Sequence, residues 1–192
     1  MSSDTKRAVG EVTQLLFAAR GGDREALDRI VALVYDDLRR LARRQISREY
    51  GERTLHPTTL VHEAYLKLAG SSAIPAEDRA HFFAIAAHAM RQVLVDDARK
   101  RAAVKRGAGW ERTTFSDQDW AADFKPDEIV ALNDAIEQLE PRQRQIVECR
   151  FFGGMEEREI AGVLGVTERT VRRDWVKARA WLYRALYDTP AN

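Results

Sequence analysis

The sequence predicts an all-α protein built from two small helical domains joined by a linker. Two observations predict helices: apolar residues recur at spacings of three and four along nearly the whole chain, and the alternation typical of strands is almost absent. A third observation predicts the division, because this periodicity stops over residues 103–128 and then resumes. With 192 residues, 45% of them hydrophobic and 32% charged, the chain is long enough for two small cores.

The first domain is expected over residues 11–102, after a disordered N-terminus of residues 1–10. Gly21 and Gly22 precede Asp23, which is a candidate N-cap for the helix that follows. We expect that helix to continue to a turn near Tyr50-Gly51, because its apolar residues mark a single face: Leu27, Ile30, Val31, Val34, Leu38 and Leu41.

Two more helices complete this domain. One is expected to begin at Thr58 or Thr59, directly after Pro57, and to end at the loop 70–75. The other is expected from Arg79 to Arg101, with an apolar face that includes Phe82 and Phe83. Core packing is one interpretation of these two phenylalanines, and stacking on nucleic-acid bases is the other.

The linker, residues 103–128, separates two basic segments. Residues 99–106 hold five basic side chains and no acid, and residues 168–184 hold six basic side chains and two acids. Residues 111–128 between them hold six acids and two basic residues. This distribution indicates a polyanionic partner held at two places, although a solvated helix end would also explain the first basic segment.

The second domain, residues 129–188, contains the sequence EEREIAGVLGVTERTVRRDWVKAR over residues 156–179. It predicts two helices joined by a turn at 165–167, in which Gly165 supplies backbone freedom and Thr167 caps the second helix. Apolar residues occupy the positions that the small core of a helix-turn-helix requires: Ile160, Ala161, Leu164, Val166, Val171 and Trp175.

The other faces of the second helix are basic. Arginine there can reach guanine edges in the major groove or phosphates, although a merely solvated face is the simpler alternative. We expect this helix to bind DNA through Arg169, Thr170, Arg172, Arg173, Val176 and Lys177.

Other classes of protein are disfavoured. Cys149 is the single cysteine and no signal peptide or membrane span is visible, so we expect a cytoplasmic protein. We expect no enzyme and no cofactor, because His62-Glu63 lacks the second histidine of a zinc-protease motif. His81 and His88 share a helix face but lack a third metal ligand, which favours structural roles.

Two other functions stay open. A conventional regulator would combine the helix-turn-helix with a sensing or dimerisation domain, and a protein-interaction adaptor would have no affinity for DNA. The basic segment at residues 99–106, far from the helix-turn-helix, argues against the conventional regulator.

The chain resembles the extracytoplasmic-function (ECF, or group IV) sigma factors of bacterial RNA polymerase. LEPRQRQIVECRFFGGMEEREIAGVLGVTERTVRRDWVKARAWL resembles their C-terminal domain, and LVHEAYLKL with FFAIAAHAMRQVLVDDARKR resembles their N-terminal domain. A closer likeness is to a subgroup marked by QLL, GDREAL, LRRLARR, LVHEAYL, AHFFA and RDW followed by ARAWLY.

The resemblance implies a division of labour. The N-terminal domain would bind the β′ clamp helices of core RNA polymerase and melt the −10 element of the promoter. The C-terminal domain would bind the −35 element and the β flap, and the acidic linker would run toward the RNA exit path. The sequence neither indicates nor excludes an anti-sigma factor.

The residues expected at these surfaces follow from that division. A melted strand is held by stacking, pockets and backbone charge, which the N-terminal domain can supply from the loop 70–81 and from His88, Arg91, Gln92, Arg99, Lys100 and Arg101. Gln92 stands where the family often has Asn. The polymerase is expected to contact Leu60, Val61, Glu63 and Tyr65.

One departure from the family concerns the positions before LVHE, where acids usually pair with the clamp helices. Here residues 56–59 are His, Pro, Thr and Thr. In some members of the closer subgroup, a Ser/Thr kinase supplies the missing charge by phosphorylating a threonine. We therefore expect Thr58 or Thr59 to be such a switch, since a phosphate adds about −1.5 to −2 charges and is favoured at a helix N-terminus. Simple helix capping by one of them is the alternative.

Overall fold

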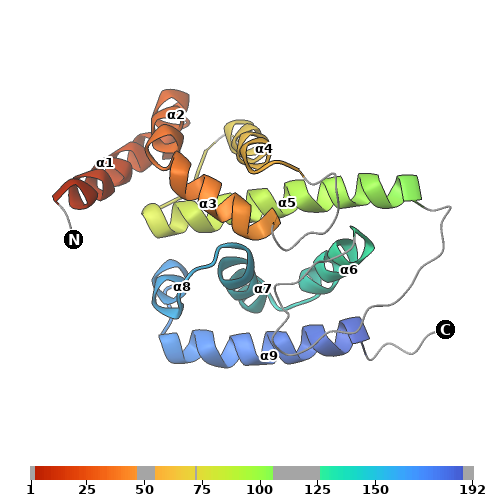
Figure 1. The fold of residues 1–192 in the computed structure, drawn as a ribbon. Helices are drawn as coiled ribbons and strands as arrows, with labels where there is room; N and C mark the ends of the chain where they lie inside the picture. The colour runs from red at the N-terminus through yellow and green to blue at the C-terminus, as the bar shows by residue number, and fades with distance from the viewer. Residues whose placement is uncertain (1–2, 47–54, 72, 106–125, 188–192) are drawn as a thin grey trace.

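The computed structural model describes residues 3–46, 55–71, 73–105 and 126–187, and within these ranges the chain is helical and contains no strand. This confirms the predicted all-α class. The linker predicted over residues 103–128 lies mostly outside the described residues. The helices on either side of it pack against each other, so the two halves form one body (Figure 1).

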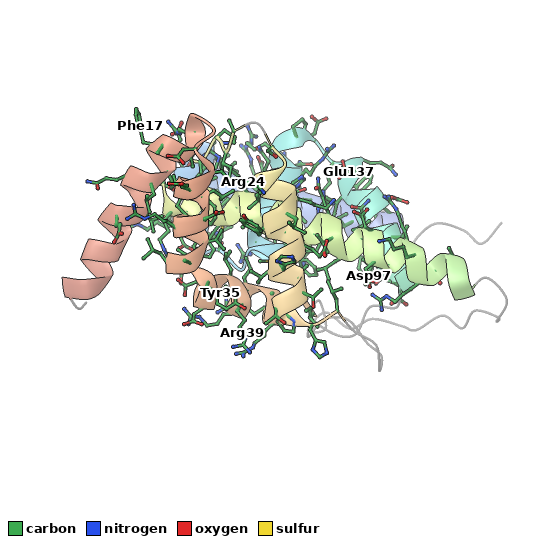
Figure 2. The ribbon with its side chains drawn as sticks, turned by 90° about the horizontal axis from the view of Figure 1, so that it is seen from above. Phe17, Arg24, Tyr35, Arg39, Asp97 and Glu137 are labelled. Carbon is green, nitrogen blue, oxygen red and sulfur yellow. The ribbon has the colours of Figure 1, made fainter. Side chains whose placement is uncertain are left out.

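In the described part of the chain, the long central helix is preceded by α1 (Ser3–Arg20), α2 (Arg24–Leu33), α3 (Tyr35–Ile46) and α4 (Pro57–Ala69). The predicted cap of α2 is confirmed, because the backbone N–H of Ala26 donates to Oδ1 of Asp23 at 3.1 Å. Seen from above, α1 and α2 form a hairpin at one end of the molecule and α4 crosses the central helix (Figure 2).

Two boundaries among α1, α2 and α3 differ from the prediction. Helix α1 begins at Ser3, inside the stretch expected to be disordered. Its C-terminal half is anchored by buried Val12 and Leu16, and extending an existing helix from such an anchor costs little free energy. The helix expected to run from residue 24 to a turn near residue 50 is broken at Val34, whose φ of −109° and ψ of 12° are not helical. The break lets α2 pack on α1 and α3 on α4. The apolar spacing continues across Val34, so the sequence pattern did not show it.

Helix α5 (Arg79–Lys105) is the long helix predicted from Arg79, and it ends four residues later than expected. It belongs to two cores. Phe82, Ala86 and Met90 pack with α1–α4, whereas Val95 and Ala98 pack with residues of the second domain. The core interpretation of Phe82 is confirmed by its 0% exposure. A helix buried on several sides carries apolar residues all around, and α5 accordingly lies between the two layers of helices (Figure 1).

The second layer contains α6 (Pro126–Glu137), α7 (Pro141–Val147), a π-helical turn η1 (Glu148–Phe152), α8 (Glu157–Leu164) and α9 (Glu168–Tyr187). Helix α6 begins at Pro126, inside the predicted linker, because Pro suits the first turn of a helix and Asp127 and Glu128 are favoured near its positive end. Pro141 opens α7 as predicted.

The π turn ends at Gly153, where the sequence predicts the end of an ordinary helix. The N–H of Gly153 donates to the carbonyl of Glu148 at 2.9 Å. A Cβ on residue 153 would lie 2.4 Å from the carbonyl oxygen of Cys149, so only glycine fits there. The turn places Glu148 on the side of η1 that faces α5.

Replacement of Gly153 by alanine is expected to lower the free energy of unfolding by about 1–3 kcal/mol, because the new methyl group forces a backbone shift in a packed region. Gly162→Ala is the matched control, since a Cβ there meets nothing within 4 Å and the residue lies inside α8. We expect that control to raise stability by up to about 1 kcal/mol. Urea unfolding of both variants measures the difference, and equal effects would contradict this account of the turn.

Candidate nucleic-acid and polymerase interfaces

The turn between α8 and α9 has the geometry of a helix-turn-helix. Gly165 ends α8 in the left-handed region at φ 62°, ψ 33°. The N–H of Val166 donates to the carbonyl of Ala161 at 3.0 Å. The N–H of Thr170 donates to Oγ1 of Thr167 at 3.2 Å, which confirms the predicted cap. These bonds fix the direction in which α9 leaves α8.

The core of this unit is the predicted one. Ile160 and Val171 are fully buried and Ala161 is 8% exposed, so the two helices approach closely there. Leu164, Val166 and Trp175 are partly buried against them. Ala178 and Leu182 of α9 are buried in the core of the second domain, so one exposed face of α9 remains for solvent.

Five of the six residues of α9 predicted to bind DNA are exposed, namely Arg169, Arg172, Arg173, Val176 and Lys177. Val176 is 60% exposed and lies among these cations in the sequence of α9. The sixth residue, Thr170, is half-buried and bonded to Thr167. The structure thus brings cations and one apolar side chain together on one exposed face.

Carboxylates hold two of these arginines. Glu157 at the start of α8 accepts from Nη2 of Arg172 at 2.7 Å and from Nη1 of Arg150 at 3.0 Å. These hydrogen bonds, first from Arg172 and then from Arg150, lower the pKa of Glu157. The guanidinium of Arg150 also lies 4.9 Å from the ring centre of Trp175. Arg172 is therefore oriented by a neighbouring helix rather than free to rotate.

Arg173 is held by Asp174, which is only 2% exposed. Asp174 accepts from Nε of Arg142 at 2.7 Å and from Nε of Arg173 at 3.0 Å. Among the described residues, Arg169 and Lys177 have no such partner. The sequence placed the cations on one face but gave no signal for the acids that orient them.

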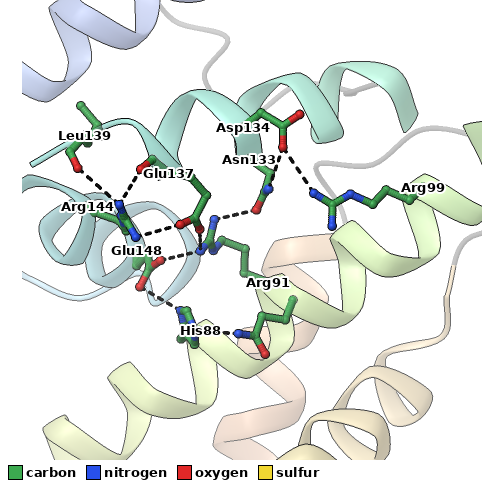
Figure 3. A network of polar contacts seen from close by, with 10 residues as sticks. His88, Arg91, Arg99, Asn133, Asp134, Glu137, Leu139, Arg144 and Glu148 are labelled. Atoms are coloured by element: carbon green, nitrogen blue, oxygen red, sulfur yellow. Dashed lines mark hydrogen bonds and ion pairs between the residues drawn. The ribbon is translucent and has the colours of Figure 1, made fainter. Parts of the chain in front are cut away.

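The predicted −10 residues of α5 face the second domain. Arg91 is 2% exposed and lies against Asn133 and Glu137 of α6 and Glu148 of η1 (Figure 3). Nδ1 of His88 is 3.0 Å from Oε2 of Glu148, and Gln92 bonds to His88. The structure thus brings His88, Arg91 and Gln92 together, but at the contact between the two domains.

The basic end of α5 is more open. Arg99 is exposed, and its Nη2 lies 3.3 Å from Oδ1 of Asp134 in α6. Lys100 is also exposed, and Arg101 pairs with Asp97 one turn earlier at 2.8 Å. This part of the predicted −10 surface is accessible in the structure.

Comparison with known proteins identifies the family. A family model described as ECF sigma factor matches residues 9–188. The chain belongs to the ECF sigma factor family. A solved structure of CnrH in complex with the cytosolic domain of CnrY matches 94% of this chain and 99% of that chain, with 21% identity and a TM-score of 0.40. A comparison with curated proteins found no match.

The family is one of transcription regulators rather than enzymes, and this sigma factor directs transcription initiation. ECF sigma factors bind core RNA polymerase, promoter DNA and anti-sigma factors. Within the part of the chain that the structure describes, no helix has the length and apolarity needed to cross a bilayer.

The four residues expected to contact the polymerase lie on different sides of α4. Leu60 and Val61 are 0% and 4% exposed and belong to the core, so they cannot contact a partner directly in this structure. Glu63 is exposed, and the hydroxyl of half-buried Tyr65 donates to Oδ1 of Asp28 at 2.7 Å. Leu60 and Val61 can support such an interface only by holding α4 in place.

Thr58 and Thr59 are both exposed in the first turn of α4. The helix begins at Pro57, one residue before the earlier of the two predicted starts, and its N-cap is His56, which makes no side-chain capping bond. Neither threonine is therefore the N-cap, and the capping alternative is wrong. Proline at the first helical position explains the shift, because its fixed φ suits that position.

The histidines do not form a metal centre in the described residues, where no group of three or more possible ligands occurs. Nδ1 of His81 accepts from the N–H of Glu77 at 3.4 Å, and His88 bonds to Glu148 and Gln92. Burial, and then the charge of Glu148, raises the pKa of Cys149 to about 12, so its thiol stays protonated.

Asp174→Asn is expected to cost about 2 kcal/mol of unfolding free energy at neutral pH, because a buried carboxylate loses charged hydrogen bonds. Burial raises the pKa of Asp174, but hydrogen bonds from Arg173 and Arg142 outweigh it, and the pKa falls below 3.8. A lowered pKa gives stability that is complete above the unfolded value and is lost as pH falls through the folded one.

The difference in unfolding free energy between wild type and Asp174→Asn should therefore become smaller at pH values below about 4. Denaturant unfolding at several pH values measures it. Asp36→Asn, at an exposed site in the first turn of α3, is the control and should change stability little. A constant difference between wild type and Asp174→Asn at all pH values would contradict the pairing.

Proposed function

We propose that this sigma factor reads the −35 element through α9 and the −10 element through α5, and that phosphorylation of Thr58 or Thr59 promotes its binding to the polymerase. The observation that carries the first part is the exposed basic face of α9 on a well-formed helix-turn-helix. The β flap is the proposed partner of the second domain, and the β′ clamp helices are the proposed partner of α4.

The face of α9 supports DNA binding because it combines an arginine side chain held in place by a carboxylate with cationic side chains that can move. Arg172, held by Glu157, is restrained in the way that bidentate reading of a base requires. Arg169 and Lys177 are free to reach phosphates or bases. Val176 supplies an apolar contact of the kind that recognises the methyl group of thymine.

Purified protein is expected to direct initiation by core RNA polymerase from one class of promoter. Arg169→Ala should weaken promoter binding by about 1–3 kcal/mol. Run-off transcription and binding to promoter fragments at fixed salt measure both effects. Arg24→Ala, which removes an exposed cation of α2, is the control and should leave promoter binding unchanged.

The mode of contact follows from the same experiment. If Arg169 binds phosphate, its loss weakens all sequences alike and reduces the salt dependence of binding. If it reads a base, its loss relaxes selectivity at one −35 position. A protein that binds operator DNA but never joins core polymerase would instead be a conventional regulator and would overturn the proposal.

The first turn of α4 supports a phosphorylation switch. It contains no acidic residue, and its N-cap residue, His56, makes no side-chain capping bond. A phosphate on Thr58 or Thr59 would meet the backbone N–H groups of this turn and the positive end of the helix dipole. It would also restore negative charge next to exposed Glu63, on the helix proposed to meet the clamp.

The double variant Thr58→Ala/Thr59→Ala is expected to lose kinase-dependent binding to core polymerase while keeping its basal level. Core-binding assays with and without Ser/Thr kinase treatment measure this. Thr13→Ala, an exposed threonine of α1, is the control and should respond to the kinase like wild type. Equal stimulation of the double variant and wild type would exclude the switch.

A further inference from the structure

We propose that the second domain buries Arg91, the central cation of the candidate DNA-binding face of α5, in the closed form, and that binding of a melted strand to this arginine requires the domains to separate. The blocking contacts form the Arg91 network, which consists of His88, Arg91, Asn133, Glu137 and Glu148 (Figure 3). The inference rests on the proposed role of α5 in reading the −10 element.

Arg91 is the centre of the network. Arginine is rarely fully buried unless it is paired, yet this side chain is 2% exposed. Its Nη1 donates to Oδ1 of Asn133 at 2.8 Å, and its Nη2 lies 2.8 Å from Oε1 of Glu137 and 2.7 Å from Oε1 of Glu148. All three acceptors belong to the second domain.

The neighbouring candidates on α5 are held by the same carboxylate. Oε2 of Glu148 is 3.0 Å from Nδ1 of His88, so its two oxygens contact two residues of α5. Nε2 of Gln92 is 2.8 Å from Nε2 of His88. Glu148 thus engages His88 and Arg91 directly and Gln92 through His88.

The second domain presents to α5 the chemistry that a nucleic acid would present. Glu137 and Glu148 bring negative charge, as phosphates do, and the amide oxygen of Asn133 is an acceptor like those on base edges. Hydrogen bonding to Arg91 lowers the pKa of Glu137, so the carboxylate stays charged near neutral pH. These residues occupy the donors of Arg91 that a DNA strand would need.

The closed and DNA-bound forms must therefore be alternatives. A side chain that is 2% exposed cannot reach an incoming strand while the domains are packed. The fraction of closed molecules lowers the apparent affinity for DNA in proportion. Glu148 is itself 7% exposed, so removing the acids leaves the guanidinium of Arg91 buried without charged partners, which favours separation.

The test changes only the acidic side of the network. Glu137→Gln/Glu148→Gln keeps the size of both side chains and leaves His88, Arg91 and Gln92 intact. We expect the radius of gyration in small-angle X-ray scattering to rise by several ångströms from the roughly 16 Å of a compact chain of 192 residues. We also expect binding to a pool of fluorescent single-stranded 12-mers to tighten about tenfold at fixed salt.

The control removes two acids of the same domain that lie outside the Arg91 network. Asp127→Asn/Glu140→Gln, at two exposed sites, makes the same change of charge and should alter neither radius nor affinity. Glu137→Gln alone, at a half-exposed residue, should fold normally and move both readouts in the same direction by a smaller amount.

Two outcomes would overturn the inference. If the double variant stays compact, the Arg91 network does not hold the domains together. If it opens but binds the oligonucleotides no more tightly than its control, the contact does not mask a DNA site. Neither measurement uses the polymerase, so failure of the proposed function, seen as absent initiation with core enzyme, is recognised separately.

Discussion

The contact between the two domains combines the apolar packing of Val95 and Ala98 with the burial of one guanidinium. Arg91 leaves solvent only because three acceptors from the other domain surround it, and Glu148 among them is almost as deeply buried. A buried charge without such partners is strongly unfavourable. The net free energy of a buried ion pair is small, but its directionality is high, so the network selects one orientation of the second domain on α5.

The π turn contributes to this selection. It widens the helix after α7 and sets Glu148 toward α5, while Gly153 lets the chain turn back over Cys149. Nε2 of buried Gln45 donates to the carbonyl of Phe152 at 2.8 Å, which ties α3 to the same turn. π-helical turns are rare and often lie at functional sites. In this sigma factor, the turn supplies the acid that contacts the candidate DNA-binding residues.

Helix α9 shows a similar use of acids for a different purpose. Glu157 and Asp174 restrain Arg172 and Arg173 without covering them, since both arginines stay exposed. At α5 the acids bury a cation, and at α9 they orient cations toward solvent. The two surfaces therefore differ in accessibility: the candidate cations of α9 are exposed, whereas on α5 Arg91 is buried and Arg99 and Lys100 are exposed.

The sequence by itself determined the helical class, the helix-turn-helix and the basic face of α9. These depend on local signals, such as the spacing of Ile160, Val171 and Trp175, the left-handed turn at Gly165 and the cap at Thr167. It also determined the family, because its motifs lie in the expected order. Local spacing could not reveal the break at Val34, since the apolar pattern runs through it.

Only the tertiary structure decided which charged residues meet. His88 and Glu148 are 60 positions apart, and Arg91 and Glu137 are 46 apart, so no local pattern links them. Arg91 looked like a free cation in the sequence because burial depends on what packs against a helix. The same reason removed Leu60 and Val61 from the accessible surface. Pairing between distant charges follows from packing, and packing is a property of the whole fold.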